Sequence, residues 1–294
     1  MKPPIEPNRE DCCNSGCNPC IFDIYEKHLA IYKKYQETGE KSDMYLQNAI
    51  SQTEYTTFIV ISNTEICVSH NLILLKKMPN TNSQTVVWNP GDHFLVKYNS
   101  VPCTRAYTPV KLKRQNHDDF DFSIIVKRYT HGLVSNYLCD LKSGDETLWR
   151  GPYGFYEVTR NKFNRIIMVA QGTGILPFVS IIEKILSDED DMTKLVLYYC
   201  CQNISTVLFR DELYTYQCYW NFTYKIFIND VPEKTCHKYR EPITSHKLHF
   251  KDVIELEPFS IHDQFMICGS SKFIKDYETF LKNENGFPGN IILF

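Results

Sequence analysis

The sequence changes its periodicity near residue 160, and this change limits the folds that are open to the chain. Residues 55–156 carry six short segments rich in β-branched and aromatic residues, with turn residues between them. From Asn164 onward, apolar strand patterns alternate with helical repeats. The first pattern is typical of a small antiparallel barrel, and the second of a parallel sheet with helices on both faces.

We therefore predict a β + α/β protein with a cysteine-rich helical leader over residues 1–48, an antiparallel β-barrel over 49–160 and a parallel α/β domain over 161–294. The chain of 294 residues is long enough for two domains of ordinary size. The domain boundary is expected in the polar stretch 159–163. The expected barrel strands are 56–62, 66–77, 93–98, 105–110, 120–129 and 146–154, with a loop and short helix at 131–138.

The leader differs in composition from the rest of the chain, because four of its cysteines lie within nine positions: Cys12, Cys13, Cys17 and Cys20. Thiolates at such short spacing can bind zinc or an iron–sulfur centre. The usual second pair is missing, however, and no histidine lies nearby. A packed, turn-rich loop or a thiol-rich tail are the alternatives, and we expect no bound metal.

Residues 22–39 carry an amphipathic helical pattern that Gly39 can end. The apolar stripe consists of Ile24, Tyr25, His28, Leu29, Ile31, Tyr32 and Tyr35. We expect this helix to dock on the body of the protein, with a partner-binding helix as the alternative.

Charge and hydropathy exclude several classes of function. The net charge of −3 gives no general case for binding nucleic acid. No apolar run approaches the roughly 20 residues that cross a bilayer, and the polar, proline-rich start lacks the features of a signal peptide. We expect a cytoplasmic, soluble monomer without a transmembrane segment, whose twelve cysteines are reduced.

The segment Arg105-Ala106-Tyr107-Thr108-Pro109 (RAYTP) is the main binding candidate in the barrel. In an extended strand, Arg105 and Tyr107 point to one face and Thr108 to the other. A guanidinium fork suits phosphate oxygens, and a phenol ring can cover a planar heterocycle. The pattern therefore favours a ligand that is both anionic and flat. The alternative is that the segment binds no ligand and consists of a surface arginine beside a core tyrosine.

In the α/β part, the turn Gly172-Thr173-Gly174 follows a strand and opens a helix. A helix N-terminus attracts anions, but a single Gly-x-Gly is a weak signal. Cys268 and Gly269 end another strand at the same edge of the expected sheet, where ligands of open parallel sheets bind. A buried structural cysteine is the alternative interpretation of Cys268.

Five motifs follow one another along the chain: RAYTP at 105–109, HGLVS at 131–135, GPYG at 151–154, GTGILP at 172–177 and CGSS at 268–271. In this order they resemble the flavoprotein reductases of the ferredoxin-reductase type, and most closely the family of NADH-cytochrome b5 reductases. The resemblance covers about residues 55–294. The leader resembles the oxidoreductase-like N-terminal motif that precedes some reductases, as in the reductase-like subgroup of this family.

The resemblance implies that the barrel binds FAD through the RAYTP segment. By this likeness Arg105 contacts the pyrophosphate and Tyr107 lies along the flavin, with Ala106 in the same contact segment. Thr108 would hydrogen-bond the reactive edge of the flavin ring, which makes it one of two candidate catalytic residues.

The HGLVS motif would supply the second phosphate contact of the barrel, through Gly132, Leu133, Val134 and Ser135. Leu133 stands where the family usually has a lysine, so one cation is missing. Lys127 matches a family lysine implicated in pyridine nucleotide binding, with a solvated strand lysine as the alternative.

For the α/β domain, the resemblance implies that Gly172, Thr173 and Gly174 face the nicotinamide nucleotide. Cys268, the second candidate catalytic residue, would pack beside the nicotinamide, and Phe294 matches a terminal aromatic residue of the family that lies near the flavin.

Three further residues in this domain carry weaker signals. Ser270 and Ser271 replace two prolines of the family, so the turn loses rigidity but could gain a helix N-cap. Asp230 could accept ribose hydroxyls, which favours NADH over NADPH.

The resemblance as a whole implies an FAD-dependent NADH reductase, which passes a hydride from NADH to FAD and then single electrons to cytochrome b5 or a similar acceptor. Such a role would serve lipid metabolism and could involve peripheral association with membranes that carry the acceptor. A reductase for a different acceptor, such as a quinone or an iron–sulfur protein, is one alternative. A non-catalytic, partner-binding module on a degenerate reductase fold is the other.

Overall fold

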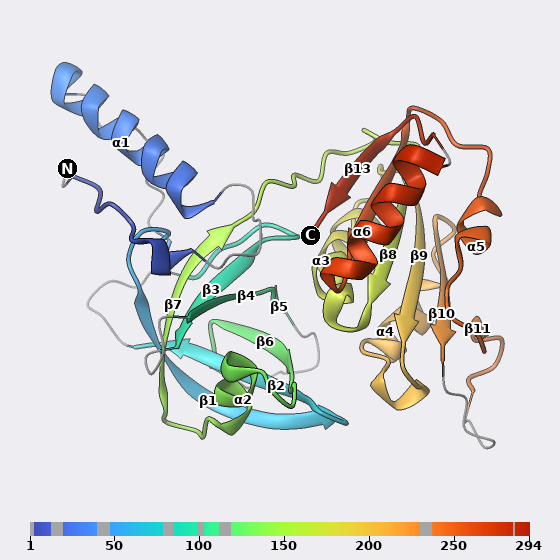
Figure 1. Cartoon of the computed structure of the whole chain (residues 1–294), viewed down its shortest axis with the longest axis horizontal. Helices are drawn as coiled ribbons and strands as arrows, with labels where there is room; N and C mark the ends of the chain where they lie inside the picture. The colour runs from blue at the N-terminus through green and yellow to red at the C-terminus, as the bar shows by residue number, and fades with distance from the viewer. Residues whose placement is uncertain are drawn as a thin grey trace. The chain divides into compact units, whose positions relative to one another are not determined.

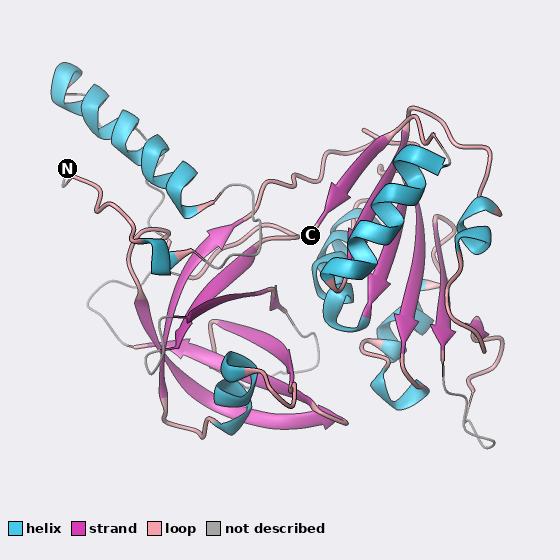
Figure 2. Cartoon of the chain, viewed as in Figure 1, coloured by secondary structure: helices cyan, strands magenta, loops and turns pink. Residues whose placement is uncertain are grey.

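The computed structural model describes residues 3–12, 20–39, 48–78, 85–98, 103–111, 119–229, 237–284 and 286–294. The chain forms two compact units, Met1–Glu157 and Val158–Phe294 (Figure 1). The first unit consists mainly of strands, and the second alternates strands with helices (Figure 2). These two sheets confirm the predicted fold class of an antiparallel barrel followed by a parallel α/β domain.

The first unit is built on a seven-stranded antiparallel sheet in the order β4-β3-β7-β1-β2-β6-β5. Its two edge strands, β4 and β5, are consecutive in the sequence and separated by Thr108 alone. The segment that contains RAYTP therefore closes the sheet into a barrel. The strands are β1 (Thr56–Cys67), β2 (His70–Lys77), β3 (His93–Tyr98), β4 (Cys103–Tyr107), β5 (Pro109–Val110), β6 (Phe122–Lys127) and β7 (Glu146–Tyr153).

Aromatic rings fill the interior of this barrel. The ring of Phe122 makes edge contacts with Phe58, Phe94 and Trp149, at centroid distances of 5.0, 4.9 and 5.4 Å. Such T-shaped pairs stabilise a core beyond the burial of their area. Helix α2 (Leu133–Asp140) adds Val134 to the same cluster, so the HGLVS motif is anchored in the barrel core.

Two strands differ from the sequence prediction. The segment 66–77 is divided, because β1 continues to Cys67 and a tight turn at Val68 and Ser69 leads into β2. Ser69 adopts a left-handed conformation with φ of 61°, which serine seldom favours, so the turn lacks a sequence signal. The predicted strand 105–110 is likewise split at Thr108 into β4 and β5.

The leader contributes a short 3-10 turn, η1 (Arg9–Asp11), and the helix α1 (Ile21–Thr38), which ends at Gly39 with φ of 71° as predicted. The helix docks on the barrel as expected, through its first turn. Only Ile21 and Ile24 of α1 are buried, and Ile24 packs against Leu95 and Tyr153 of the barrel.

The second unit holds a six-stranded parallel sheet in the order β11-β10-β9-β8-β12-β13. The chain moves from β8 through β9 to β10 on one side, and returns to β12 on the other side of β8. Right-handed crossovers then place α3 and α4 on one face and α6 on the other, and α6 crosses in front of the sheet in Figure 1.

The strands of this unit are β8 (Arg165–Gln171), β9 (Lys194–Cys201), β10 (Phe222–Ile228), β11 (Ile243–Thr244), β12 (Asp263–Cys268) and β13 (Asn290–Leu293). Its helices are α3 (Leu176–Leu186), α4 (Arg210–Tyr216), α5 (Phe250–Ile254) and α6 (Ser271–Thr279), with 3-10 turns η2 (Gly172–Ile175) and η3 (Ile204–Thr206) and a π-helical turn η4 (Phe280–Glu284). Across the described ranges, every helix is too short or too polar to span a bilayer.

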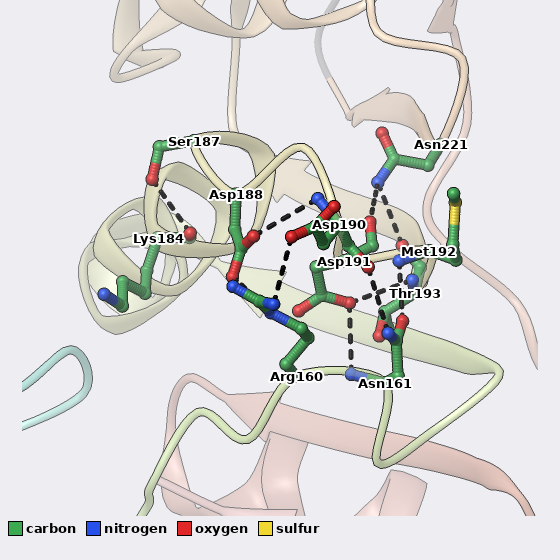
Figure 3. Close-up of polar contacts among 10 residues, drawn as sticks. All are labelled: Arg160, Asn161, Lys184, Ser187, Asp188, Asp190, Asp191, Met192, Thr193 and Asn221. Atoms are coloured by element: carbon green, nitrogen blue, oxygen red, sulfur yellow. Dashed lines mark hydrogen bonds and ion pairs between the residues drawn. The ribbon is translucent and has the colours of Figure 1, made fainter.

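The polar stretch between the two sheets is fastened to the loop that joins α3 to β9 (Figure 3). Arg160 Nε donates to Asp188 Oδ2 at 2.8 Å, and its Nη1 donates to Asp190 Oδ2 at 3.1 Å. Asn161 accepts the backbone N–H of Met192 at 2.7 Å and donates to the backbone oxygen of Asp190 at 3.0 Å. These residues therefore belong structurally to the second unit.

Candidate cofactor sites

The barrel presents one exposed cation on the RAYTP segment. Arg105 lies on β4 with an exposed side chain, and its Nη1 donates to the backbone oxygen of Thr104 at 2.8 Å. Within the described ranges, no carboxylate lies within ion-pair distance of its guanidinium. The guanidinium is therefore available to an anionic ligand.

The neighbouring residues of the segment point in different directions. The ring of Tyr107 packs edge-on against buried Trp149, with centroids 6.2 Å apart. Burial raises the pKa of the Tyr107 phenol, so the hydroxyl stays protonated. The side chain of Ala106 packs against Ile24 and Leu95 on the opposite face. Thr108 is half-buried between β4 and β5.

Helix α2 packs against β4 and β6 and begins at the HGLVS motif. Gly132 is its N-cap, and a Cβ atom at this position would collide with the Ser135 hydroxyl. That hydroxyl donates to the Gly132 oxygen at 3.2 Å and accepts from the Tyr129 N–H at 3.3 Å, so it is already used within the turn. The backbone N–H groups of the first helical turn, rather than the Ser135 side chain, are left for an anion.

Two further residues near this turn differ in what they can offer. Leu133 is exposed at 58% and adds no charge. Lys127 ends β6, and its ammonium lies over the ring of Tyr129 at 5.6 Å from the centroid. Lys127 thus supplies a half-buried cation close in sequence to the start of α2.

In the second unit, the turn after β8 and the turn after β12 meet at the topological switch point of the sheet. The chain leaves β8 toward β9 on one side, while β12 pairs with β8 on the other. Ligands of open α/β sheets bind in the crevice at this position. Gly174 lies directly against the backbone of Cys268, since a Cβ atom there would come within 2.7 Å of the Cys268 carbonyl carbon.

The two other residues of the glycine turn face open space. Gly172 adopts φ of 56°, and a Cβ atom added there would have nothing within 4 Å. Glycine suits this position because of its left-handed backbone conformation and not because a side chain would collide. Thr173 is half-exposed in the same turn.

A side chain that the sequence did not single out joins the two turns. Gln171 Oε1 accepts a hydrogen bond from Ser270 N–H at 3.1 Å and another from the Ser270 hydroxyl at 2.8 Å. The Ser270 oxygen in turn accepts from Phe273 N–H at 3.4 Å, which confirms the expected N-cap of α6. Glutamine at a strand end has no motif that would predict this contact.

Cys268 is a neutral thiol at the end of β12. Burial raises its pKa to about 12, so it cannot act as a thiolate near neutral pH. Phe294 follows β13, donates its backbone N–H to Ile267 at 3.0 Å and packs its ring edge-on against Phe178 at 5.6 Å. Asp230, the predicted ribose contact, lies outside the described residues.

Each unit therefore fits one half of a cofactor pair. The barrel offers an exposed arginine beside an aromatic wall and the start of a helix, which suits a phosphate-linked planar ligand. The α/β unit offers a glycine turn at the switch point and an uncharged thiol, which suits close approach of a dinucleotide.

Comparison with known families agrees with this geometry. The family of oxidoreductase FAD-binding domains matches residues 58–158, and the family of oxidoreductase NAD-binding domains matches residues 168–279. The N-terminal family of oxidoreductase-like proteins matches residues 1–41. Each match falls on the part of the chain where the corresponding features lie.

Two curated relatives extend over nearly the whole chain. NADH-cytochrome b5 reductase-like of Mus musculus is 28% identical over 287 residues, which cover 93% of this chain and 89% of the relative. The Homo sapiens protein of the same name is 27% identical over 294 residues, covering 93% and 88%. The solved cytochrome b5 reductase domain of Ulva prolifera nitrate reductase has a TM-score of 0.66 at 20% identity, covering 83% of this chain and 100% of that domain.

Proposed function

Because the chain belongs to the FAD- and NAD-binding oxidoreductases of the cytochrome b5 reductase family, we propose that it transfers electrons from NADH through FAD to cytochrome b5 or a similar acceptor. The observation that carries the proposal is the match of both cofactor-binding families to one chain, each on a unit with a fitting site. FAD, when bound, would accept a hydride and release electrons singly, and the protein supplies binding and orientation.

The barrel residues would bind and orient FAD. We assign the pyrophosphate to Arg105 and to the backbone N–H groups at Leu133 and Val134, because both offer positive charge without a carboxylate partner in the described residues. Tyr107 would cover the planar part of the cofactor with its protonated phenol. Thr108 would donate its hydroxyl to the ring edge from the seam between β4 and β5.

The residues of the α/β unit would bind the nicotinamide nucleotide. The turn from Gly172 to Gly174 would let the nucleotide approach the backbone at the switch point, and Cys268 would contact the nicotinamide ring. The neutral thiol of Cys268 would act by packing and not by proton transfer. Phe294 completes the proposed set of this unit as an aromatic wall, and Lys127 of the barrel is proposed as a nucleotide-binding cation on the family resemblance alone.

The acceptor is the part of the proposal that rests on relatives alone. Several relatives carry the name NADH-cytochrome b5 reductase, including the Candida glabrata protein that is 30% identical over 181 residues. We propose cytochrome b5 as the acceptor on this basis. A chain of twelve cysteines with no expected disulfide framework suits a reducing, cytoplasmic location.

The first test is whether the purified protein is yellow and whether NADH bleaches its flavin absorption in a stopped-flow instrument. Cys268→Ala should keep its full flavin content but reduce bound FAD on the order of a hundredfold more slowly, because a small misplacement of the reacting groups has that cost. Cys218→Ala is the matched control, because Cys218 is an exposed cysteine outside the proposed site. Normal reduction in Cys268→Ala would refute the placement of nicotinamide at this thiol.

The acceptor is tested in the same preparation. Reduced wild-type protein should pass electrons to cytochrome b5, observed as the haem spectrum of the reduced form. If NADH reduces the protein but the reduced protein reacts only with a quinone or an iron–sulfur protein, the proposed cofactors stand and cytochrome b5 is the wrong acceptor.

A further inference from the structure

We propose that Cys12 and Cys20 bind a zinc ion where the leader meets the barrel. Their Sγ atoms lie 3.9 Å apart, although eight positions separate them in the sequence. Both side chains are half-buried. Thiolates are preferred ligands of zinc, and two of them at this distance can bind one zinc ion together with further donors.

The separation of the two sulfurs favours a shared metal over a disulfide. Two thiolates on one tetrahedral zinc, with bonds of about 2.3 Å, lie about 3.8 Å from each other. A disulfide would need a sulfur–sulfur distance of about 2.05 Å. At 3.9 Å the two thiols are in hydrogen-bond contact, and the same separation suits two thiolates on one zinc without a displacement of either residue.

The barrel anchors the element that carries Cys12. This residue directly follows η1, whose Asp11 accepts a hydrogen bond from Arg150 through its backbone oxygen. The Asp11 carboxylate also lies 3.4 Å from Arg150 Nη1, and only 2% of the Arg150 side chain is exposed. The guanidinium of Arg150 stacks over the Tyr55 ring, at 4.6 Å from the centroid. Cys12 is thus held by a buried cation of β7.

The element that carries Cys20 is anchored separately. Cys20 is the N-cap of α1, and its backbone N–H donates to Asp23 Oδ2 at 2.7 Å. One turn further, Ile24 is buried against Leu95 and Tyr153 of the barrel. Because both sulfurs belong to elements that the barrel anchors, metal binding would not need to order them first.

Zinc normally takes four donors. Among the residues that the structure describes, no group of three or more histidine, cysteine, aspartate or glutamate side chains could hold a metal. Cys13 and Cys17 lie outside the described residues, so the experiment decides whether they contribute. The sequence alone led us to expect no metal, and the closeness of Cys12 to Cys20 is what changes that expectation.

The experiment measures metal in the full chain, produced with added zinc and purified without chelator, by elemental analysis and native mass spectrometry. We expect about one zinc per chain, in keeping with a structural site. Zinc should fall to background in Cys12→Ser and in Cys20→Ser, and stay unchanged in the exposed control Cys218→Ser. Cys13→Ser and Cys17→Ser, measured alongside, identify further ligands.

A second measurement does not depend on the folding of any variant. Cobalt(II) added to metal-stripped wild-type protein should produce thiolate-to-cobalt absorption in a difference spectrum, and zinc should abolish it. Background zinc with no cobalt absorption would overturn the proposal. So would bound iron in place of zinc, or a mass lower by two hydrogens that a thiol reductant restores, since that mass marks a disulfide. None of these readouts depends on flavin or NADH.

Discussion

The Cα atom of Gly174 lies against the backbone carbonyl of Cys268, and the space between them has no room for a side chain. A Cβ atom at position 174 would come within 2.7 Å of the Cys268 carbonyl carbon and 3.0 Å of Gly269 N. The two turns at the switch point therefore touch through their backbones, and this contact fixes the distance between them.

Gly174→Ala should disturb nucleotide binding while leaving the barrel untouched. The added methyl group must displace the backbone of Cys268, because backbone cannot rotate away as a side chain can. We expect reduction of FAD by NADH to slow on the order of a hundredfold, with flavin content unchanged. Gly39→Asn, at the open C-cap of α1, is the control. Wild-type kinetics in Gly174→Ala would place the nucleotide elsewhere.

Arg105→Ala should weaken FAD binding. Loss of a charge-assisted contact of about 1.5–3 kcal/mol corresponds to an affinity lower by about tenfold or more. Arg105→Lys should recover part of the affinity, because lysine keeps the charge but not the bidentate fork. Fluorescence titration of the flavin-free protein with FAD measures these affinities, with Lys142→Ala as an exposed control on the same unit. Equal affinity in all four proteins would remove Arg105 from the site.

Gln171→Ala should loosen the turn after β12, because Ser270 loses both hydrogen bonds to the Gln171 oxygen. We expect the KM for NADH to rise by about tenfold with a smaller change in kcat, since each such bond contributes about 1 kcal/mol. Ser270→Pro in the Gln171→Ala background should restore part of the affinity, because proline rigidifies the turn by itself. Independent effects of Gln171→Ala and Ser270→Ala in a double-mutant cycle would argue against coupling.

Asp92 and His93 should give opposite slopes to the pH dependence of stability. Burial raises the pKa of Asp92 to about 6. Its contribution to the free energy of unfolding is therefore full below about pH 4 and is lost as the pH rises to 6. Burial lowers the pKa of His93 to about 4, so its contribution is full above pH 6.5 and is lost as the pH falls to 4. The two slopes largely cancel in the wild type.

Asp92→Asn should therefore reveal the pH dependence of stability that His93 causes. We expect the free energy of unfolding of the barrel to fall by about 3 kcal/mol between pH 6.5 and pH 4, since each pKa unit corresponds to about 1.4 kcal/mol. Asparagine can still accept the hydrogen bond from Asn89 N–H, so the turn should survive. Urea unfolding followed by tryptophan fluorescence at several pH values measures this slope. A slope like that of the wild type would contradict the buried state of His93.

The fold was predictable from periodicity, and the exceptions have physical causes. The helix 21–38 ends at Gly39 because glycine alone adopts the left-handed C-cap freely. The turn at Ser69 was missed because serine carries the left-handed conformation there without glycine or proline nearby. An amphipathic stripe predicts which face of α1 is apolar, but it cannot say how much of that face has a partner, and only the first turn is buried.

Candidate site residues were predictable from the sequence where they belong to a motif at a recognisable place in the fold. The motifs placed Arg105 on a strand and Gly174 in the turn after a strand, and both lie there in the structure. The structure adds that Arg105 has no carboxylate partner in the described ranges and that Gly174 sits at a backbone contact. The role of Gln171 could not be read from the sequence, because it depends on Ser270, which lies 99 positions away in the chain. The same holds for Cys12 and Cys20, whose spacing in sequence gives no distance in space.

Anyone who dissects the protein should cut the chain before Val158 and not at the end of the polar stretch. A fragment that begins there keeps Arg160 beside Asp188 and Asp190, and keeps Asn161 bonded to Met192. A fragment that begins at Asn164 would leave the carboxylates of Asp188 and Asp190 without this cation. Arg160 and Asn161 thus belong to the second unit by their contacts, although hydropathy alone would assign them to the linker.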